Sequence, residues 1–256
     1  MKKILSTVIL FSCLFTACEY DNYNEPDVVF SGNIVYNGEN VIYDGDPAKP
    51  LFRVIQSGYG KVDGGTAVQT RADGSFRHLL FPGRYQFTPY NNIYPFVFPD
   101  YPYLGESEGY PQTRLDLYEN FSMDIEVIPY YVITDFNAVW DAEKQEIHMS
   151  CQVAPNDDAR LGGRIPAIRA VRGYVSTTAI VNSVTSCVTK VDGNWPSYSG
   201  ASVMEVKIED YYKAYVNNFR DYGYCRMAFE LEGIKDYYLF TPTLKVEGLP
   251  VQEWKK

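Results

Sequence analysis

The sequence predicts an all-β protein with two β-sandwich domains. After residue 27, short runs of alternating apolar residues are separated by turns that contain glycine or proline, as in sandwich domains. The chain contains 23 tyrosines and 14 phenylalanines, and aromatic residues favour strands. The roughly 240 residues beyond an N-terminal apolar segment suit two domains of ordinary size.

The first 17 residues are predicted to be a secretory signal peptide. Lys2 and Lys3 give a basic start, and residues 4–17 are mainly apolar but too few to anchor the chain stably across a membrane. The small residue Ala17 precedes Cys18, and this junction resembles a bacterial lipobox. The resemblance implies cleavage before Cys18 and acylation of its thiol, which would attach the protein to membrane lipid. An ordinary signal peptide with an incidental cysteine is the alternative.

Residues 18–27 are expected to form an acidic tether. The segment cannot bury enough apolar surface to fold alone. It carries four carboxylates, on Glu19, Asp21, Glu25 and Asp27. An acidic run after a lipidated cysteine resembles the export signal of Bacteroidetes surface lipoproteins, which implies an outer-membrane location exposed at the cell surface. A plain solvated linker is compatible with the same residues.

The net charge of the chain limits the classes of partner that it can bind. Without residues 1–17 the chain has 21 basic and 32 acidic residues, a net charge of −11. Binding to nucleic acid requires a basic surface, so we expect no nucleic-acid partner. An acidic body is also not attracted to anionic lipid, so the acyl chains on Cys18 would have to hold it at the outer membrane.

Three cysteines lie in the predicted domains, at Cys151, Cys187 and Cys225. Because the number is odd, at least one stays unpaired within the chain. Cys151 and Cys225 occur in strand-like runs, where a buried thiol behaves as a small apolar side chain. A disulfide between two of the three remains compatible with an oxidising compartment.

The first domain, residues 28–129, is predicted to be a sandwich of short strands. Three favourable turn pairs separate them, at Asn37-Gly38, Asp73-Gly74 and Pro82-Gly83. The expected strands are residues 28–36, 51–56, 66–70, 75–80, 84–87 and 122–128.

Residues 89–114 interrupt this pattern with a segment rich in proline and aromatic residues. Prolines deny it a continuous ladder of hydrogen bonds, so we expect a long loop at the rim of the sandwich. Tyrosine can stack on a sugar ring and asparagine can bind its hydroxyls, which makes the loop a candidate glycan site. Its candidate ligand-binding residues are Tyr90, Asn91, Asn92, Tyr94, Phe96, Phe98, Tyr101 and Tyr103. The alternative, favoured by the apolar run 96–98, is that the loop covers a sheet or docks on the second domain.

The second domain, residues 130–248, repeats the all-β pattern after Pro129. Two packed sheets in an immunoglobulin-like or fibronectin-like order would bury the apolar positions of its strands. Residues 210–216 are expected to form a short helical turn or an edge crossing, and the tail 249–256 is expected to be loosely held. The expected strands are residues 146–153, 167–181, 187–191, 202–208, 222–231 and 237–246.

Three motifs carry a resemblance to a known family. They are Gly32-x-Ile34-x-x-Asn37-Gly38, Ala72-Asp73-Gly74-Ser75-Phe76 and Leu80-Phe81-Pro82-Gly83-Arg84-Tyr85. They look like the transthyretin-like, carboxypeptidase-regulatory type of sandwich, in which the glycines turn the chain while Phe76 and Tyr85 point into one core. With the lipobox and the tether, the chain resembles the Bacteroidetes lipoprotein family called domain of unknown function 3823. The resemblance implies an immunoglobulin-like second domain and an association with SusC/SusD-type glycan uptake systems, but no activity.

Residues with catalytic or metal-binding chemistry are sparse. His78 and His148 are the two histidines, each in a strand-like run without a companion at a recognised ligand spacing. The carboxylate pairs at 44–46 and 106–108 and the polar run 156–158 lack the pattern of a calcium loop or a glycosidase site. Turns explain 44–46 and 156–158 better, and the pair at 106–108 is better explained as solvated charge on a loop. We therefore expect no enzyme activity, no cofactor and no metal.

The sequence favours a non-catalytic, surface-anchored lipoprotein. It would either bind glycan or dock on a SusC/SusD-like transporter of a polysaccharide uptake system. A structural or adhesive module of the cell envelope is the alternative.

Overall fold

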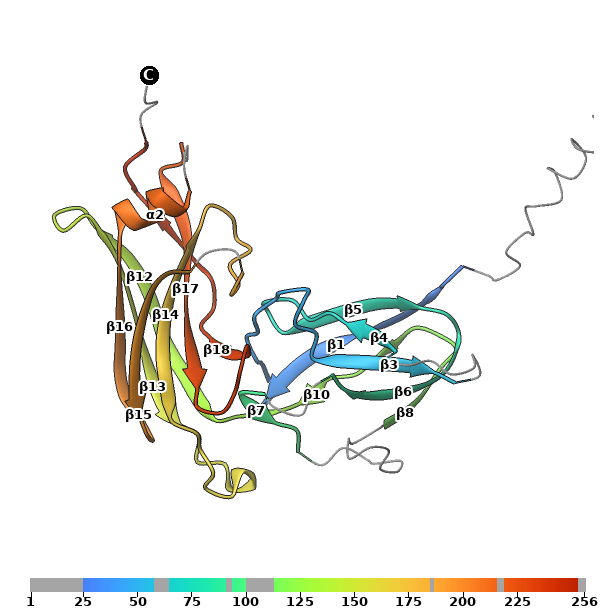
Figure 1. The fold of residues 1–256 in the computed structure, drawn as a ribbon. Coiled ribbons are helices and arrows are strands. Elements are labelled where there is room, and N and C mark those ends of the chain that lie inside the picture. Colours follow the sequence, from blue (N-terminus) through green and yellow to red (C-terminus); the bar gives the residue numbers. More distant parts are fainter. Residues whose placement is uncertain are drawn as a thin grey trace, which may run out of the picture.

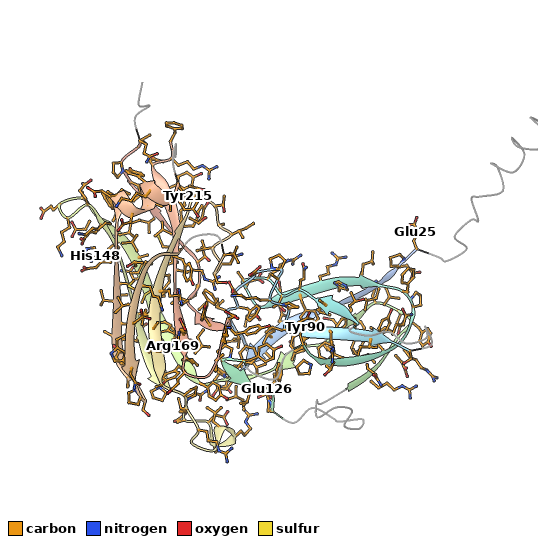
Figure 2. All side chains as sticks on the ribbon, viewed as in Figure 1. Glu25, Tyr90, Glu126, His148, Arg169 and Tyr215 are labelled. Carbon is orange, nitrogen blue, oxygen red and sulfur yellow. The ribbon has the colours of Figure 1, made fainter. Side chains whose placement is uncertain are left out.

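Two β-sandwich domains make up the computed structural model, which describes residues 25–57, 65–90, 94–99, 113–184, 187–215 and 219–252 (Figure 1). The predicted all-β class with two sandwiches is confirmed. The domains lie at a steep angle to each other and meet at one end of each, and Glu25 lies at the end of the first domain that is remote from this junction (Figure 2).

Over the described ranges, no helix combines the length and apolar character of a membrane span. The predicted signal peptide and Cys18 lie outside those ranges.

The first domain is organised around β1, which pairs with strands on both of its edges. One sheet joins β1 to β2, β5, β9 and β10, and the second has the order β4-β3-β6-β8. A two-stranded pair, β7 and β11, lies next to the junction. The bounds are β1 (Val28–Tyr36), β2 (Glu39–Asn40), β3 (Phe52–Gln56), β4 (Thr66–Val68), β5 (Ser75–Leu80), β6 (Gly83–Pro89), β7 (Phe96–Val97), β8 (Thr113–Leu117), β9 (Phe121–Ser122), β10 (Ile125–Glu126) and β11 (Ile128–Pro129).

Aromatic rings fill the core of this domain. Phe30, Phe52, Phe76 and Phe87 are all buried, and the ring centroids of Phe52 and Phe87 are 4.8 Å apart. Tyr85 is buried as well, so both aromatic residues of the two turn motifs point inward as predicted. Burying such large rings is the main favourable contribution to folding of a small sandwich.

The alternating segment 122–128 does not form the single strand that its pattern predicts. It divides into β9, β10 and β11, and the first two run parallel to β1. The break at Met123 lies opposite Gly32, where the Met123 carbonyl oxygen would be 1.8 Å from any added Cβ. Asp124, between β9 and β10, keeps this segment attached to β1, because its carboxylate accepts hydrogen bonds from the backbone and side-chain nitrogens of Asn33 at 3.1 and 3.0 Å. The alternation of apolar and polar residues therefore indicated extended backbone here, but it did not indicate that the segment is divided among three strands.

The second domain packs a three-stranded sheet, β12-β13-β16, against a larger sheet in the order β15-β14-β17-β18, to which β19 adds through β17. The buried positions of β13 and β17 face each other between the sheets. The bounds are β12 (Tyr131–Asp141), β13 (Glu146–Pro155), η1 (Ala159–Leu161), β14 (Ile168–Ser176), β15 (Cys187–Trp195), β16 (Gly200–Lys207), α2 (Ile208–Ala214), β17 (Tyr222–Leu231), β18 (Tyr238–Phe240) and β19 (Leu244–Glu247).

This domain differs from the sequence prediction in several features, among them the end of β14 at Ser176, five residues before the end of the predicted strand 167–181. The 11-residue strand β12 was not predicted, and its pairing with β13 shifts register between Thr134 and Asn137, where Asp135 has a positive φ of 54°. The predicted strand 237–246 is divided into β18 and β19 because Pro242, which has no N–H donor, interrupts it. The short helix expected near 210–216 is confirmed as α2.

The thiols of Cys151 and Cys225 are free and buried, and burial raises the pKa of each to about 12. Since the thiolate is the reactive form, we expect neither residue to react with a maleimide at pH 7.5 in the folded protein. Both should be labelled after unfolding in urea. Peptide mass mapping of the two samples tests this, and native labelling at either position would contradict it.

Candidate binding site at the domain junction

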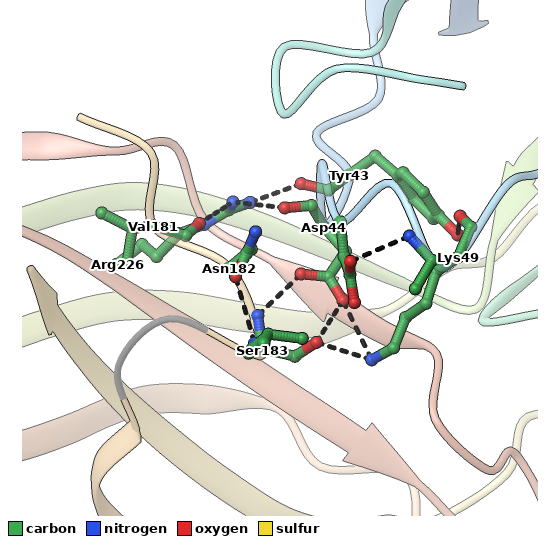
Figure 3. A network of polar contacts seen from close by, with 10 residues as sticks. Tyr43, Asp44, Lys49, Val181, Asn182, Ser183 and Arg226 are labelled. Atoms are coloured by element: carbon green, nitrogen blue, oxygen red, sulfur yellow. Dashed lines mark hydrogen bonds and ion pairs between the residues drawn. The ribbon is translucent and has the colours of Figure 1, made fainter. Parts of the chain in front are cut away.

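The two domains meet around a buried arginine, Arg226 of β17 (Figure 3). Its guanidinium donates 2.7 Å hydrogen bonds to the carbonyl oxygens of Tyr43 and Val181. Longer contacts of 3.4 and 3.3 Å reach the carbonyl oxygens of Asp44 and Thr241. Burial lowers the pKa of Arg226 to about 10, so the side chain still carries its charge at neutral pH.

This single side chain spans the junction. Tyr43 and Asp44 belong to the loop before β3 in the first domain, whereas Val181 and Thr241 belong to the second. The guanidinium also lies 4.0 Å from the ring centroid of Phe240, which covers one of its faces. A buried arginine is costly unless its donors are satisfied, and here carbonyls from both domains satisfy them.

The carboxylate of Asp44 completes the network and is 1% exposed. It accepts hydrogen bonds from the backbone nitrogen and hydroxyl of Ser183 at 2.8 and 2.6 Å, and it forms a 3.1 Å ion pair with Lys49. Gly45 follows with a positive φ of 72°, which turns the chain. The acidic pair at 44–46 is thus a turn, as expected, but one whose first carboxylate joins the domains.

Aromatic and polar contacts extend the junction on either side. The rings of Tyr94 and Tyr237 meet edge to face with centroids 4.9 Å apart. The hydroxyl of Tyr36 donates to Asn156 at 3.0 Å, and the buried Asn156 amide in turn donates to the carbonyl of Pro129 at 2.9 Å. These contacts, together with the arginine network, favour a fixed angle between the sandwiches.

A cavity of about 320 Å³ opens beside this junction, between β1 and β2 of the first domain and β12 and β18 of the second. Its inner wall consists of buried apolar side chains, among them Tyr131, Leu239 and Phe240. Ligand pockets lie preferentially at domain interfaces, and this volume is at the lower end of their usual range of about 300–1,000 Å³. We call this cavity the junction groove.

The rim of the junction groove is polar on the side of the first domain. Glu39 and Asn40 are exposed there, and the Asn40 amide donates to the carbonyl of Asp73 at 3.0 Å, which fixes its position. The ring of Tyr36 is half-buried and is held by its hydrogen bond to Asn156. A carboxylate, an amide and aromatic faces therefore surround an apolar floor, which suits a ligand with both hydroxyls and C–H surface.

The aromatic loop, by contrast, is largely part of the core. Tyr94 and Phe96 are 4% and 3% exposed, their rings stack with centroids 5.4 Å apart, and Phe98 packs edge to face against both. Tyr94 also donates to the carbonyl of Leu51 at 2.9 Å. The prediction that Tyr94 and Phe96 offer faces to a sugar is therefore wrong for this conformation, and the alternative of a docked loop describes them.

The other candidates of this loop have different outcomes. Tyr90 is 48% exposed, so its ring remains accessible. The remaining candidates lie outside the described residues, and for them the binding prediction stays a prediction. They are Asn91, Asn92, Tyr101 and Tyr103.

A smaller cavity of about 170 Å³ lies within the second domain, between β14, β15 and β16. Trp195 and Tyr198 are half-buried at its side, and its other walls are mainly aliphatic. It lies between the two sheets of one sandwich and lacks the charged rim of the junction groove. The junction groove is therefore the stronger candidate site.

Sequence reasoning did not single out the residues of the junction groove. They come from β1, β2, β12 and β18, which are separated by up to about two hundred positions in the chain. The one local signal was the Asn37-Gly38 turn, which places Glu39 and Asn40 at the tip of a hairpin. That signal indicated a turn, but it carried no information about which residues of the second domain lie opposite the turn.

Comparison with known proteins identifies the first domain. The family described as "Protein of unknown function (DUF3823) N-terminal domain" matches residues 28–128. No curated protein is significantly similar to the chain.

Solved structures share the fold over both domains. A DUF3823 family protein from Parabacteroides merdae matches with a TM-score of 0.65 and 19% identity, covering 88% of this chain and all of that one. A DUF3823 family protein from Bacteroides uniformis matches with a TM-score of 0.66 and 13% identity, covering 87% and 99%. A further Bacteroides uniformis protein, provisionally described as a carbohydrate binding protein, matches with a TM-score of 0.61 and 13% identity, covering 87% and 99%. Residues 28–128 therefore match the DUF3823 N-terminal domain, and the whole chain has the two-domain fold of solved DUF3823 proteins.

Proposed function

We propose that this protein is a non-catalytic carbohydrate-binding lipoprotein that holds glycan in the junction groove. The observation that carries the proposal is the groove itself, an apolar cavity between two locked domains with a carboxylate and an amide on its rim. The description of one protein of the same fold as carbohydrate-binding supports the same class of ligand.

The chemistry of the groove suits a pyranose ring. Axial C–H bonds of a sugar pack on aromatic and aliphatic walls, while its ring hydroxyls hydrogen-bond to carboxylate and amide groups. Glu39 and Asn40 supply those polar groups at the tip of a hairpin, and Tyr36 and Val132 border the apolar part. Because the domains are held at a fixed angle, little ordering would be required on binding.

The proposal includes a location and a process. Acylation of Cys18 would attach the protein to the outer membrane, and the acidic tether 18–27 would let the two domains stand off the lipid at the cell surface. Glycan held there could be passed to a SusC/SusD-like transporter of a polysaccharide uptake system, which is the proposed partner.

The test is glycan binding by the full-length chain purified in detergent, first on a glycan array and then by titration calorimetry. Val132, on the rim of the groove, is 36% exposed, so Val132→Trp should fill the groove without disturbing the core. We expect Val132→Trp to abolish binding and Glu39→Ala to weaken it about 10-fold, which corresponds to the loss of one good hydrogen bond to a charged group.

Tyr118→Ala provides the matched control, because this tyrosine is 63% exposed on the first domain and lies outside the groove. It should bind glycan like the wild type, and all variants should keep their melting temperature. Equal binding by wild type and Val132→Trp would reject the groove as the site. A protein that retains no glycan but co-purifies with a transporter would instead reject carbohydrate binding in favour of docking.

A further inference from the structure

Four side chains with metal-ligating chemistry gather on the outer face of the sheet β12-β13-β16. Asp141 ends β12 and lies opposite Glu146 at the start of β13. His148, two residues further along the same face, lies opposite Glu205 of β16. Figure 2 shows His148 on the side of the second domain that faces away from the first domain, so this cluster is separate from the junction groove.

The geometry around His148 is not that of ordinary hydrogen bonds. Its Nε2 atom is 3.4 Å from a Glu146 carboxylate oxygen and 3.7 Å from an Asp141 carboxylate oxygen. Imidazole hydrogen bonds to oxygen are shorter, about 2.7–3.2 Å. The same Nε2 atom is buried and has no hydrogen-bond partner among the described residues. A buried ring nitrogen that faces two carboxylates at ion-pair distance without a hydrogen bond to either requires a physical explanation.

A shared cation supplies that explanation. Two ligand atoms that each bind one tetrahedral Zn²⁺ at about 2.0–2.1 Å lie about 3.3 Å apart, close to the two distances observed. Ligand atoms of Glu146, His148 and Glu205 lie within 4.8 Å of one another, so these three residues form the most compact part of the cluster. We propose that Nε2 of His148, the adjacent carboxylate of Glu146 and, after a small shift, the carboxylate of Asp141 form a site for a divalent transition-metal ion, of which Zn²⁺ is the representative.

Surrounding groups hold the carboxylate of Asp141 in place and flank the ring of His148. One carboxylate oxygen of Asp141 accepts hydrogen bonds from the backbone nitrogens of Glu143 and Lys144, both at 3.0 Å, which leaves the other oxygen directed at His148. A carboxylate oxygen of Glu205 lies 3.5 Å from Nδ1 of His148. Glu205 thus lies beside the second ring nitrogen, and a small movement toward the ring would let it accept that N–H and orient a metal-binding histidine.

The donor set selects the class of ion. An imidazole nitrogen suits Zn²⁺, Cu²⁺ or Ni²⁺, whereas Ca²⁺ and Mg²⁺ prefer a complete shell of oxygen atoms. Three carboxylates outnumber the two nearby lysines, Lys144 in the turn and Lys207 opposite Glu146, so the site attracts cations. A bound ion would join the β12–β13 hairpin and stiffen the edge of the sheet remote from the first domain.

The experiment is a zinc titration of the full-length chain, purified without a polyhistidine tag, followed by calorimetry and by thermal melting. We expect one equivalent of Zn²⁺ to bind and to raise the melting temperature. His148→Gln should reduce the affinity at least 100-fold, Asp141→Asn and Glu146→Gln at least 10-fold, and Glu205→Gln about 10-fold, as for groups that orient a ligand. Ca²⁺ at the same concentrations should leave the melting temperature unchanged.

His78→Gln is the control, because His78 is the other histidine of the chain and lies on β5 of the first domain. It should bind zinc like the wild type. All these variants should melt at the wild-type temperature without metal, which separates loss of binding from loss of folding. The proposal is overturned if wild type and His148→Gln bind zinc equally, if neither responds to zinc, or if Ca²⁺ stabilises the protein as well as Zn²⁺ does.

Discussion

Replacing Arg226 with methionine is expected to destabilise the protein by about 3–5 kcal/mol, the usual cost of removing one partner from a buried charged network. The variant would leave the carbonyl oxygens of Tyr43 and Val181 without their 2.7 Å donors. It would also leave the buried carboxylate of Asp44 with less positive charge nearby. The free energy of unfolding, from urea denaturation followed by tryptophan fluorescence, measures the effect.

Two further variants make this prediction specific. Arg77→Met changes an exposed arginine on β5 and should shift the free energy of unfolding by less than about 0.5 kcal/mol. Arg226→Lys keeps the charge but not the planar set of donors, so its free energy of unfolding should lie between those of Arg226→Met and the wild type. If Arg226→Met and Arg77→Met unfold at the same urea concentration, the arginine does not hold the domains together.

Substituting Gly32 with alanine is expected to cost about 3 kcal/mol or more, the upper end of the range for overpacking. The new Cβ would lie 1.8 Å from the carbonyl oxygen of Met123 and 2.8 Å from the ring of Phe76. Backbone cannot swing aside as a flexible side chain can, and β1 is held by β5 on one edge and by β9 and β10 on the other. Thermal melting and expression of soluble protein report the outcome.

Gly223 offers the matched comparison for this substitution. It is also buried in a strand without a positive φ, but the nearest atoms to its added Cβ are methyl carbons of Leu249 and Val175 at 3.3 Å. Small rotations of those side chains relieve the contact, so Gly223→Ala should cost less than about 1 kcal/mol. Equal losses for the two alanine variants would show that the close approach of Met123 is not the cause.

The sequence predicted those elements whose signals are local. The bounds of β5 and β17 agree with the prediction to the residue, because each carries alternation or a dense apolar run between clear turns. The Asn37-Gly38 turn is also confirmed, since both residues have positive φ. Strand β12 escaped prediction because polar and charged residues dominate its exposed face and Asp135 interrupts its alternation.

The candidate sites were harder to predict because their residues meet through long-range contacts. Arg226 occurs in a strand of apolar residues, and its partner Tyr43 is 183 positions away, so no local pattern indicates the pair. At the proposed metal site, Asp141, Glu146 and His148 are close in the sequence, but their spacing is not a recognised ligand motif. Glu146 and His148 share one face of a strand, and a short turn places Asp141 opposite Glu146, but only the pairing of β13 with β16 adds Glu205.

The remote position of Glu25 determines which surfaces the molecule offers to its surroundings (Figure 2). If the chain is held to a surface by its N-terminus, the first sandwich would lie next to that surface and the second would lie farther from it. Because buried contacts hold the angle between the domains, the distance from the N-terminal end of the first domain to the far end of the second would stay constant. The outermost strands, including those around His148, would then be the first surface that an approaching molecule encounters.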